Sequence, residues 1–115
     1  MDIKQIQHLL AEFAEKRDWQ QFHSPKNLSM ALAVESAELL ELFQWLSEEQ
    51  SRDLDNAQQG EVSEELADVL LYLLRLADVL GIDLEAAVQN KLLKNAEKYP
   101  VDLSRGNATK YNRRD

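Results

Sequence analysis

The sequence contains no cysteine and has only 3 glycines and 2 prolines among its 115 residues. The lack of cysteine excludes a disulfide framework, a thiol nucleophile and a zinc site with cysteine ligands. The scarcity of glycine and proline, together with abundant Leu, Ala, Glu and Gln, is typical of helices and leaves few of the residues that sheets and turns require. The composition therefore predicts an all-α fold, and a hydrophobic fraction of 44% is enough for a globular core.

The chain also lacks an excess of basic residues: it has 13 Lys and Arg against 21 Asp and Glu, which gives a net charge of −8. Because proteins that grip a nucleic-acid backbone usually present a basic face, this balance argues against nucleic acid as a partner. Phosphorylated substrates are not excluded, since a bound cation can supply positive charge. From Arg105 onward the trend reverses, and this basic tail is either a solvated end or an arm that reaches phosphates.

No apolar run approaches the length of a membrane span, and the first residues are acidic and polar instead of forming a basic and then apolar leader. We therefore expect a soluble, cytoplasmic protein without a membrane partner. A length of 115 residues is typical of one domain. We expect a single all-α domain over residues 1–115, in which residues 101–115 form an extended, irregular tail.

Helical periodicity and capping signals predict four main helices that form an antiparallel bundle. They cover residues 3–17, 25–46, 61–80 and 84–98. Ser24 and Pro25 mark a helix start, and Gly81 is suited to end a helix in the left-handed conformation. A short acidic turn or helix is expected to begin at Ser47, and residues 55–60 are the most loop-like stretch before the tail. Because four short helices enclose only a small core, we expect oligomerisation to complete the bundle.

Four acidic residues lie on or beside the apolar faces of two of these helices. At about 100° per residue, Glu35 lies in the centre of one apolar stripe and Glu38 about 60° to its side. On the next helix, Glu65 lies inside the apolar face and Asp68 on its edge. The two apolar faces consist of Leu28, Ala31, Leu32, Leu39, Leu42 and Leu46, and of Val62, Val69, Leu73, Leu76 and Leu80. All four carboxylates are therefore expected to face the interior.

Inward carboxylates need compensation, because an unpaired buried charge is strongly unfavourable. The two helices and their connection provide only Lys26, Arg52 and Arg75 as local cations, too few for four acids, so metal binding is the economical interpretation. Oxygen ligands favour magnesium or manganese over zinc or copper. A di-iron centre needs Glu-x-x-His pairs, and neither His8 nor His23 follows a Glu by three positions. A Glu-x-x-Glu pair is also common on solvated surfaces, and periodicity alone leaves that alternative open.

The sequence around the four acids resembles a known family. The sequence contains Glu35-Ser36-Ala37-Glu38, followed after 26 residues by Glu65-Leu66-Ala67-Asp68. This pattern resembles the ExxE…ExxD signature of the all-α nucleoside triphosphate pyrophosphohydrolases, which form the MazG-like superfamily. The flanking sequence is closest to the dCTP pyrophosphatase branch, which it resembles at FAEKRDW (13–19), FHSPKNL (22–28), ELFQW (41–45), DVLLYL (68–73), NAEKYPV (95–101) and LSRG (103–106), followed by Lys110-Tyr111. The likeness covers nearly the whole chain.

This resemblance implies hydrolysis of a nucleoside triphosphate to its monophosphate and pyrophosphate, with Mg²⁺ required and Mn²⁺ as a substitute. It implies that Glu35, Glu38, Glu65 and Asp68 hold the metal, and that Glu38, with Glu35 beside it, is the candidate for orienting or deprotonating the attacking water. It also implies homodimers or dimer-based tetramers, with active sites near the subunit boundaries.

The resemblance extends to residues that surround or bind the nucleotide. The base-pocket candidates are His23, Trp45, Tyr72, Asn95 and Tyr99. The candidate phosphate contacts are Lys26, Lys91, Lys98 and Arg105. Each also has an ordinary structural interpretation: an aromatic side chain can belong to the core, and a lysine can be plain surface.

The leading hypothesis is an enzyme that removes dCTP or a modified dCTP from the nucleotide pool. The same chemistry on dUTP or another non-standard nucleotide is an alternative, because pocket detail decides the base. A helical interaction module whose acids pair with a basic partner is an alternative from another class.

Overall fold

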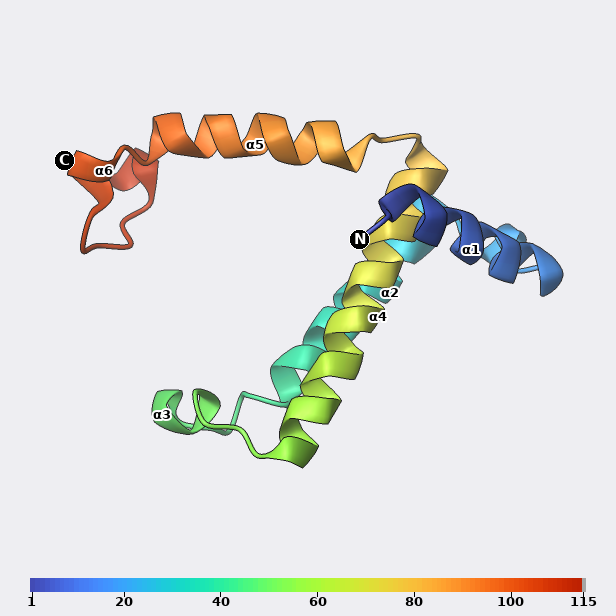
Figure 1. The fold of residues 1–115 in the computed structure, drawn as a ribbon, viewed down its shortest axis with the longest axis horizontal. Coiled ribbons are helices and arrows are strands. Elements are labelled where there is room, and N and C mark those ends of the chain that lie inside the picture. The colour runs from blue at the N-terminus through green and yellow to red at the C-terminus, as the bar shows by residue number, and fades with distance from the viewer. Residues whose placement is uncertain (115) are drawn as a thin grey trace. The chain divides into compact units, whose positions relative to one another are not determined.

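The computed structural model describes residues 1–114, and these residues form helices and no β-strand, which confirms the predicted all-α class (Figure 1). The elements, with η denoting a 3₁₀ helix, are α1 (Ile3–Lys16), η1 (Gln20–Phe22), α2 (Pro25–Glu41), α3 (Glu48–Ser51), α4 (Asn56–Leu80), α5 (Leu84–Lys98), α6 (Val101–Ser104) and η2 (Tyr111–Arg113). They form two compact units, one from Met1 to Gly81 and one that begins at Ile82.

Most of the main helices begin and end where the capping signals predict. Asp2, Ser24 and Asp83 each cap a helix, with a side-chain oxygen that accepts a hydrogen bond from the backbone N–H three residues later. Gly81 ends α4 in the left-handed conformation, with a φ of 67°. Ser47 caps the short helix α3, as expected from the acidic segment that follows it.

Two helix boundaries differ from the prediction. Helix α4 begins at Asn56 instead of residue 61, because Asp55 and Gln58 form a capping box in which each side chain accepts a hydrogen bond from the other's backbone N–H. This box turns the stretch predicted as a loop into helix. Helix α2 ends at Glu41 instead of residue 46, because most of the backbone hydrogen bonds of the next residues span three positions and tighten the chain into turns.

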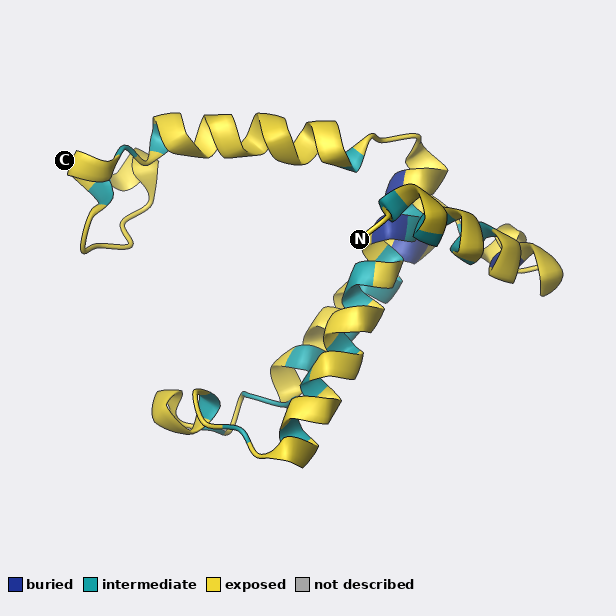
Figure 2. Cartoon of the chain, viewed as in Figure 1, coloured by how far each residue is buried: buried dark blue, intermediate teal, exposed yellow. Residues whose placement is uncertain are grey.

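In the first unit, α2 and α4 run side by side in opposite directions and α3 lies in the connection between them (Figure 1). Helix α1 packs against α4, and the Gln7 side chain donates a hydrogen bond to the Leu74 carbonyl over 2.9 Å. Among residues 1–114, the buried hydrophobic residues are Ala14, Leu28, Leu74 and Ala77, and they lie where the three helices meet (Figure 2). This small core holds together the helices that carry the acids.

The apolar faces of the two long helices are only partly as predicted. The predicted stripe of α2 is turned inward, with Leu28 buried and its other members half-buried. On α4, however, Leu73 and Leu80 are 39% and 50% exposed, whereas Leu74 and Ala77 are buried. The reason is that α4 contacts α1 as well as α2, so its buried face near the C-terminal end differs from a stripe drawn for one neighbour.

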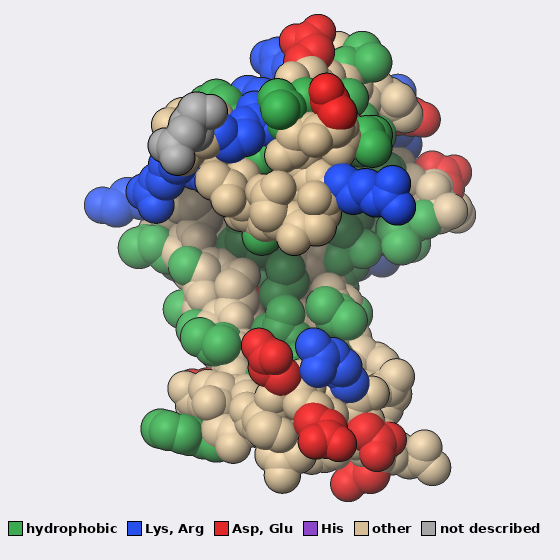
Figure 3. Space-filling view, turned by 90° about the vertical axis from the view of Figure 1, so that its left-hand side faces the viewer, with side chains coloured by type: hydrophobic (Ala, Val, Ile, Leu, Met, Phe, Trp, Pro, Cys, Tyr) green, Lys and Arg blue, Asp and Glu red, His purple; other side chains and the backbone are tan. Residues whose placement is uncertain are grey.

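Many large apolar side chains of the first unit remain exposed, and Figure 3 shows hydrophobic side chains on the face of the molecule that it draws. Trp45 is 87% exposed, and Phe22, Val34 and Leu40 are all more than half exposed. A few scattered apolar residues are normal at a protein surface. Exposure of this many large apolar side chains is typical of a surface that another molecule covers. Homo-oligomerisation stays a prediction. No helix among the described residues has both the length and the apolar character needed to cross a bilayer.

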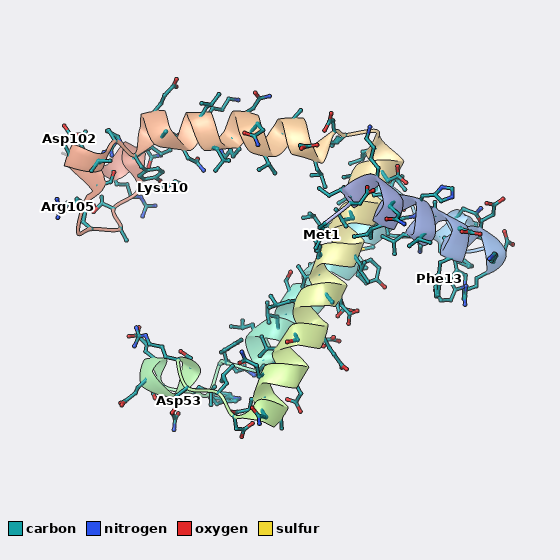
Figure 4. The ribbon with its side chains drawn as sticks, in the orientation of Figure 1. Met1, Phe13, Asp53, Asp102, Arg105 and Lys110 are labelled. Carbon is teal, nitrogen blue, oxygen red and sulfur yellow. The ribbon has the colours of Figure 1, made fainter. Side chains whose placement is uncertain are left out.

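In the second unit, the segment after α5 is more ordered than the predicted irregular tail. It contains α6 and η2, and Figure 4 shows Arg105 and Lys110 on this segment. The rings of Tyr99 and Tyr111 meet edge to face with their centroids 6.1 Å apart, and Arg114 donates a hydrogen bond to the Lys98 carbonyl. These contacts fold the segment that ends at Arg114 back onto the end of α5.

Candidate functional site

Three of the four predicted acids meet between α2 and α4. Glu35 and Glu38 lie one turn apart on α2, and Glu65 lies on α4. One carboxylate oxygen from each residue lies within 4.8 Å of the other two. Because α2 and α4 pack along their length in opposite directions, residues distant in sequence are brought to the same place on the helix pair. We call these three residues the acid cluster.

The acid cluster contains buried oxygens without partners. Glu35 and Glu65 are both half-buried, and the Oε2 atom of each is inaccessible to solvent and has no hydrogen-bond partner among the described residues. A buried carboxylate oxygen without a partner is unfavourable, because it has lost its water and gained nothing in exchange. The protein's own side chains therefore leave these two carboxylate oxygens of the cluster unsatisfied.

The electrostatics of the cluster agree with this description. The pKa of Glu35 is raised from 4.5 to about 7, first because burial disfavours the charged form. The neighbouring Glu65 and Glu38 carboxyls, which can share the proton of a protonated Glu35, and the negative charges of Glu38 and Asp68 raise this pKa further. None of the ion pairs among the described residues involves these acids. Arg75, which was considered as a local cation, pairs with Asp78 instead. The cluster thus favours a proton or a cation.

The spacing of the oxygens fits a hard divalent cation. Oxygens on opposite sides of a cation lie about 4 Å apart around magnesium and about 5 Å apart around calcium, from metal–oxygen distances of about 2.0–2.1 Å and 2.3–2.6 Å. The three oxygens of the acid cluster all lie within 4.8 Å of one another, which is close enough for them to converge on one cation. Asp68 is not one of the three, but its charge acts on Glu35 from one turn beyond Glu65 on α4.

A mostly apolar cavity of about 170 Å³ adjoins Asp68. Its lining consists of Leu10, Phe13, Trp19, His23, Asp68, Leu71, Tyr72 and Arg75. The ring of Trp19 meets those of Phe13 and His23 edge to face, with centroids 5.7 Å and 6.5 Å away. A cavity of about 150 Å³ accommodates a benzene ring, so this one has the size of a single six-membered ring. Asp68 connects the cavity to the acids.

Of the other four predicted site residues in the first unit, two line the cavity and two do not. His23 and Tyr72 line the cavity, as expected of residues that contact a base. Trp45 does not line it: this residue lies in the turn after α2 with its side chain exposed. Lys26 is exposed in the first turn of α2. Roles in binding for these four residues stay predictions.

The remaining five candidates lie in the second unit. Lys91 and Asn95 are exposed on α5, and Lys98 is its last residue. Tyr99 follows α5 and packs against Tyr111, while Arg105 follows α6. The ammonium of Lys98 lies 4.7 Å from the centroid of the Tyr111 ring. A role for these residues in binding a substrate also stays a prediction.

Five residues that line the cavity were not predicted from the sequence: the aliphatic Leu10 and Leu71, and Phe13, Trp19 and Arg75. Phe13 and Trp19 come from the end of α1 and the turn after it, and their proximity to α4 is a tertiary contact (Figure 4 labels Phe13). Arg75 could have been found, because Asp68, Tyr72 and Arg75 are spaced four and three residues apart and therefore share one face of α4.

The fold and the acid cluster together define an all-helical protein with clustered carboxylates that can hold a metal ion. The chain belongs to the MazG-like family, whose model matches residues 30–113. The matched region includes all four acids.

The chain is similar to curated relatives and to a solved structure. The chain is 47% identical to dCTP pyrophosphatase 1 of Rattus norvegicus and 42% identical to dCTP pyrophosphatase 1 of Homo sapiens, in each case over 111 residues and 95% of this chain. It spans 65% of the length of these two relatives. The crystal structure of a pyrophosphatase from Archaeoglobus fulgidus matches with a TM-score of 0.81 and 44% identity, over 87% of this chain and 94% of that chain.

Proposed function

We propose that the protein hydrolyses a nucleoside triphosphate, dCTP or a modified dCTP, to the monophosphate and pyrophosphate, with magnesium or manganese held by Glu35, Glu38, Glu65 and Asp68. The observation that carries the proposal is the pair of buried, unpartnered carboxylate oxygens of Glu35 and Glu65 within the acid cluster. The names of the relatives, dCTP pyrophosphatase 1 and a pyrophosphatase, support the chemistry and the choice of substrate.

The four acids have two tasks in this proposal. All four acids would hold the cation, and Glu38, with Glu35 as its neighbour one turn away, would also receive the proton of the attacking water. The water oxygen attacks the α-phosphorus, the bond from that phosphorus to the bridging oxygen breaks, and pyrophosphate leaves with the electron pair. A magnesium ion held by these residues would supply positive charge to the triphosphate and would make the attacking water easier to deprotonate.

The cavity beside Asp68 takes the base. Its volume of about 170 Å³ fits one six-membered ring, which favours a pyrimidine over the fused rings of a purine. Trp19 and Tyr72 provide aromatic surface against the base, and His23 provides a polar contact.

The other proposed substrate contacts are based on the resemblance to the dCTP pyrophosphatases. In this proposal Asn95, Tyr99 and Trp45 complete the surroundings of the base. The phosphate contacts come from Lys26, Lys91, Lys98 and Arg105. The exposed apolar side chains of the first unit support a homodimer or a dimer-based tetramer, in which a second copy covers them. The proposed location is the cytoplasm, where nucleotide pools are maintained.

The test is a panel of nucleoside triphosphates incubated with magnesium, with products separated by chromatography. The panel includes dCTP, a 5-modified dCTP, dUTP and a purine triphosphate. We expect monophosphate and pyrophosphate in equal amounts, with dCTP or its modified form turned over fastest. Release of single phosphates, or no turnover of any nucleotide, contradicts the proposal and favours a helical interaction module.

A matched pair of variants localises the activity to the acid cluster. Glu38→Gln removes the proposed proton acceptor and should lower kcat by roughly 100-fold or more. Glu41→Gln makes the same change on the same helix at an exposed residue outside the cluster, and should leave kcat unchanged. Full turnover by the Glu38 variant would show that this residue does not act on the water.

A further inference from the structure

Arg75 and His23 form a polar contact within the first unit that the proposed function does not use. The Nε–H of Arg75 donates a hydrogen bond to Nδ1 of His23 over 3.2 Å. The Nη1 atom of the same guanidinium lies 3.7 Å from a carboxylate oxygen of Asp78, and the Arg75 side chain is only 11% exposed. The guanidinium is therefore held between two partners and cannot easily turn away from His23.

This contact determines which nitrogen of the His23 ring carries the proton. Arginine has donors and no acceptor, so the nitrogen that faces it must be unprotonated. Burial, and then the positive charge of Arg75, hold the pKa of His23 below its ordinary value of 6.5, which keeps the ring neutral at neutral pH. A neutral imidazole with a bare Nδ1 carries its proton on Nε2. His23 therefore has one N–H, at Nε2.

The Nε2–H has no hydrogen-bond partner among the described residues, although His23 lines the ring-sized cavity. The other polar or charged residues of that lining are Trp19, Asp68, Tyr72 and Arg75. The Trp19 ring lies at 6.5 Å from the imidazole, edge to face, and limits its rotation. In a largely apolar cavity, a donor with fixed orientation distinguishes ligands by whether they place an acceptor opposite it.

We propose that Arg75 is a positioning residue that fixes His23 as an Nε2–H donor, and that this donor recognises a hydrogen-bond acceptor on the edge of the nucleotide base. The assignment of the ligand as a nucleotide rests on the proposed function, whereas the link between Arg75 and His23 does not. A base with a ring nitrogen acceptor or a carbonyl oxygen opposite Nε2 is accepted, and a base with an N–H donor at that position is disfavoured.

The tautomer is measured directly by long-range ¹H–¹⁵N correlation spectra of the ¹⁵N-histidine-labelled protein at neutral pH. The chain has 2 histidines, and the exposed His8 serves as the reference for a ring that exchanges freely between tautomers. We expect His23 to show a fully protonated Nε2 and a bare Nδ1. Arg75→Lys, which can only donate, should keep this pattern. Arg75→Gln, which can donate or accept, should shift His23 toward the mixed pattern of His8.

Steady-state kinetics with the panel of nucleoside triphosphates test the recognition of the base. Loss of one neutral hydrogen bond predicts that Arg75→Gln raises KM for dCTP roughly three- to ten-fold with little change in kcat, and that Arg75→Lys retains most of the affinity. Arg52→Gln makes the same change at an exposed arginine far from the cavity lining and is the control.

The outcomes separate the parts of the proposal. A protonated Nδ1 in the unsubstituted protein, or an unchanged His23 pattern in Arg75→Gln, overturns the positioning role. A changed pattern with unchanged KM for every nucleotide overturns the recognition of the base. If no nucleotide is turned over, the proposed function fails, and the spectra still decide the role of Arg75.

Discussion

Replacing Glu35 by glutamine removes a carboxyl group that the folded protein keeps from ionising. The pKa of Glu35 is about 7 in the folded protein, against 4.5 for an ordinary glutamate, because of burial, the neighbouring carboxyls and the charges of Glu38 and Asp68. The folded state therefore holds the proton more tightly than the unfolded state does. It follows that the metal-free protein loses stability as the pH rises from about 4.5 through about 7. Glu35→Gln stays neutral and avoids this loss.

The size of the effect follows from the same values. The difference between about 7 and 4.5 corresponds to at most about 3 kcal/mol, and solvent screening at this half-exposed side chain reduces it to about 1–2 kcal/mol. For a chain of this length, that range corresponds to a rise in Tm of about 4–8 °C above pH 7. The lowered pKa of His23 has the opposite sign, since it costs stability as the pH falls. Both proteins share that contribution, so their difference in Tm isolates Glu35.

The assay is thermal unfolding followed by circular dichroism, with a chelator present, from about pH 4.5 to about pH 8. Glu35→Gln should have the same Tm as the unsubstituted protein at the acidic end of this range. Its Tm should exceed that of the unsubstituted protein by an increasing margin as the pH rises. Magnesium should raise the Tm of the unsubstituted protein and have a much smaller effect on the variant. Glu41→Gln, on the same helix, is the control for loss of one surface charge. A difference in Tm that does not grow with pH would refute the reasoning.

Three further substitutions test the fold that supports the site. Leu74→Ala opens a cavity in the small core and should lower the free energy of unfolding by about 2–5 kcal/mol in denaturant titrations; a loss below about 1 kcal/mol would mean that the three helices do not meet there. Asp55→Ala removes the capping box and should cost about 1 kcal/mol, with faster amide exchange in the first turn of α4; unchanged exchange would argue against the early helix start. Gly81→Ala forces a side chain into the left-handed conformation and should cost about 1–2 kcal/mol in thermal unfolding, and a neutral effect would contradict the observed φ.

The fold could be predicted where local sequence determines it. Helix caps such as Ser24 and Asp83 are readable because one side chain satisfies the first free N–H groups of the helix. The early start of α4 was also readable in principle, since Asp55 and Gln58 have the spacing of a capping box, but the loop-like composition obscured it. The burial of Leu74 was not readable, because it depends on how α1 lies against α4.

The site divides in the same way. The acid cluster could be predicted because Glu35 and Glu65 fall within apolar stripes, and the packing of α2 on α4 then brings these stripes together. The cavity could not, because Phe13 and Trp19 reach it through the tertiary fold. Trp45 was assigned to the base from the resemblance, and its exposure in the first unit leaves that role to be tested.

The most direct test is a crystal structure of the protein soaked with manganese and a non-hydrolysable dCTP analogue, with anomalous diffraction used to locate the metal. We predict an anomalous peak within coordination distance, about 2.2 Å, of carboxylate oxygens of Glu35, Glu38 and Glu65 or Asp68, with phosphate oxygens of the analogue on its open side. Manganese bound elsewhere, with these carboxylates left unligated while the analogue is bound, would contradict the account.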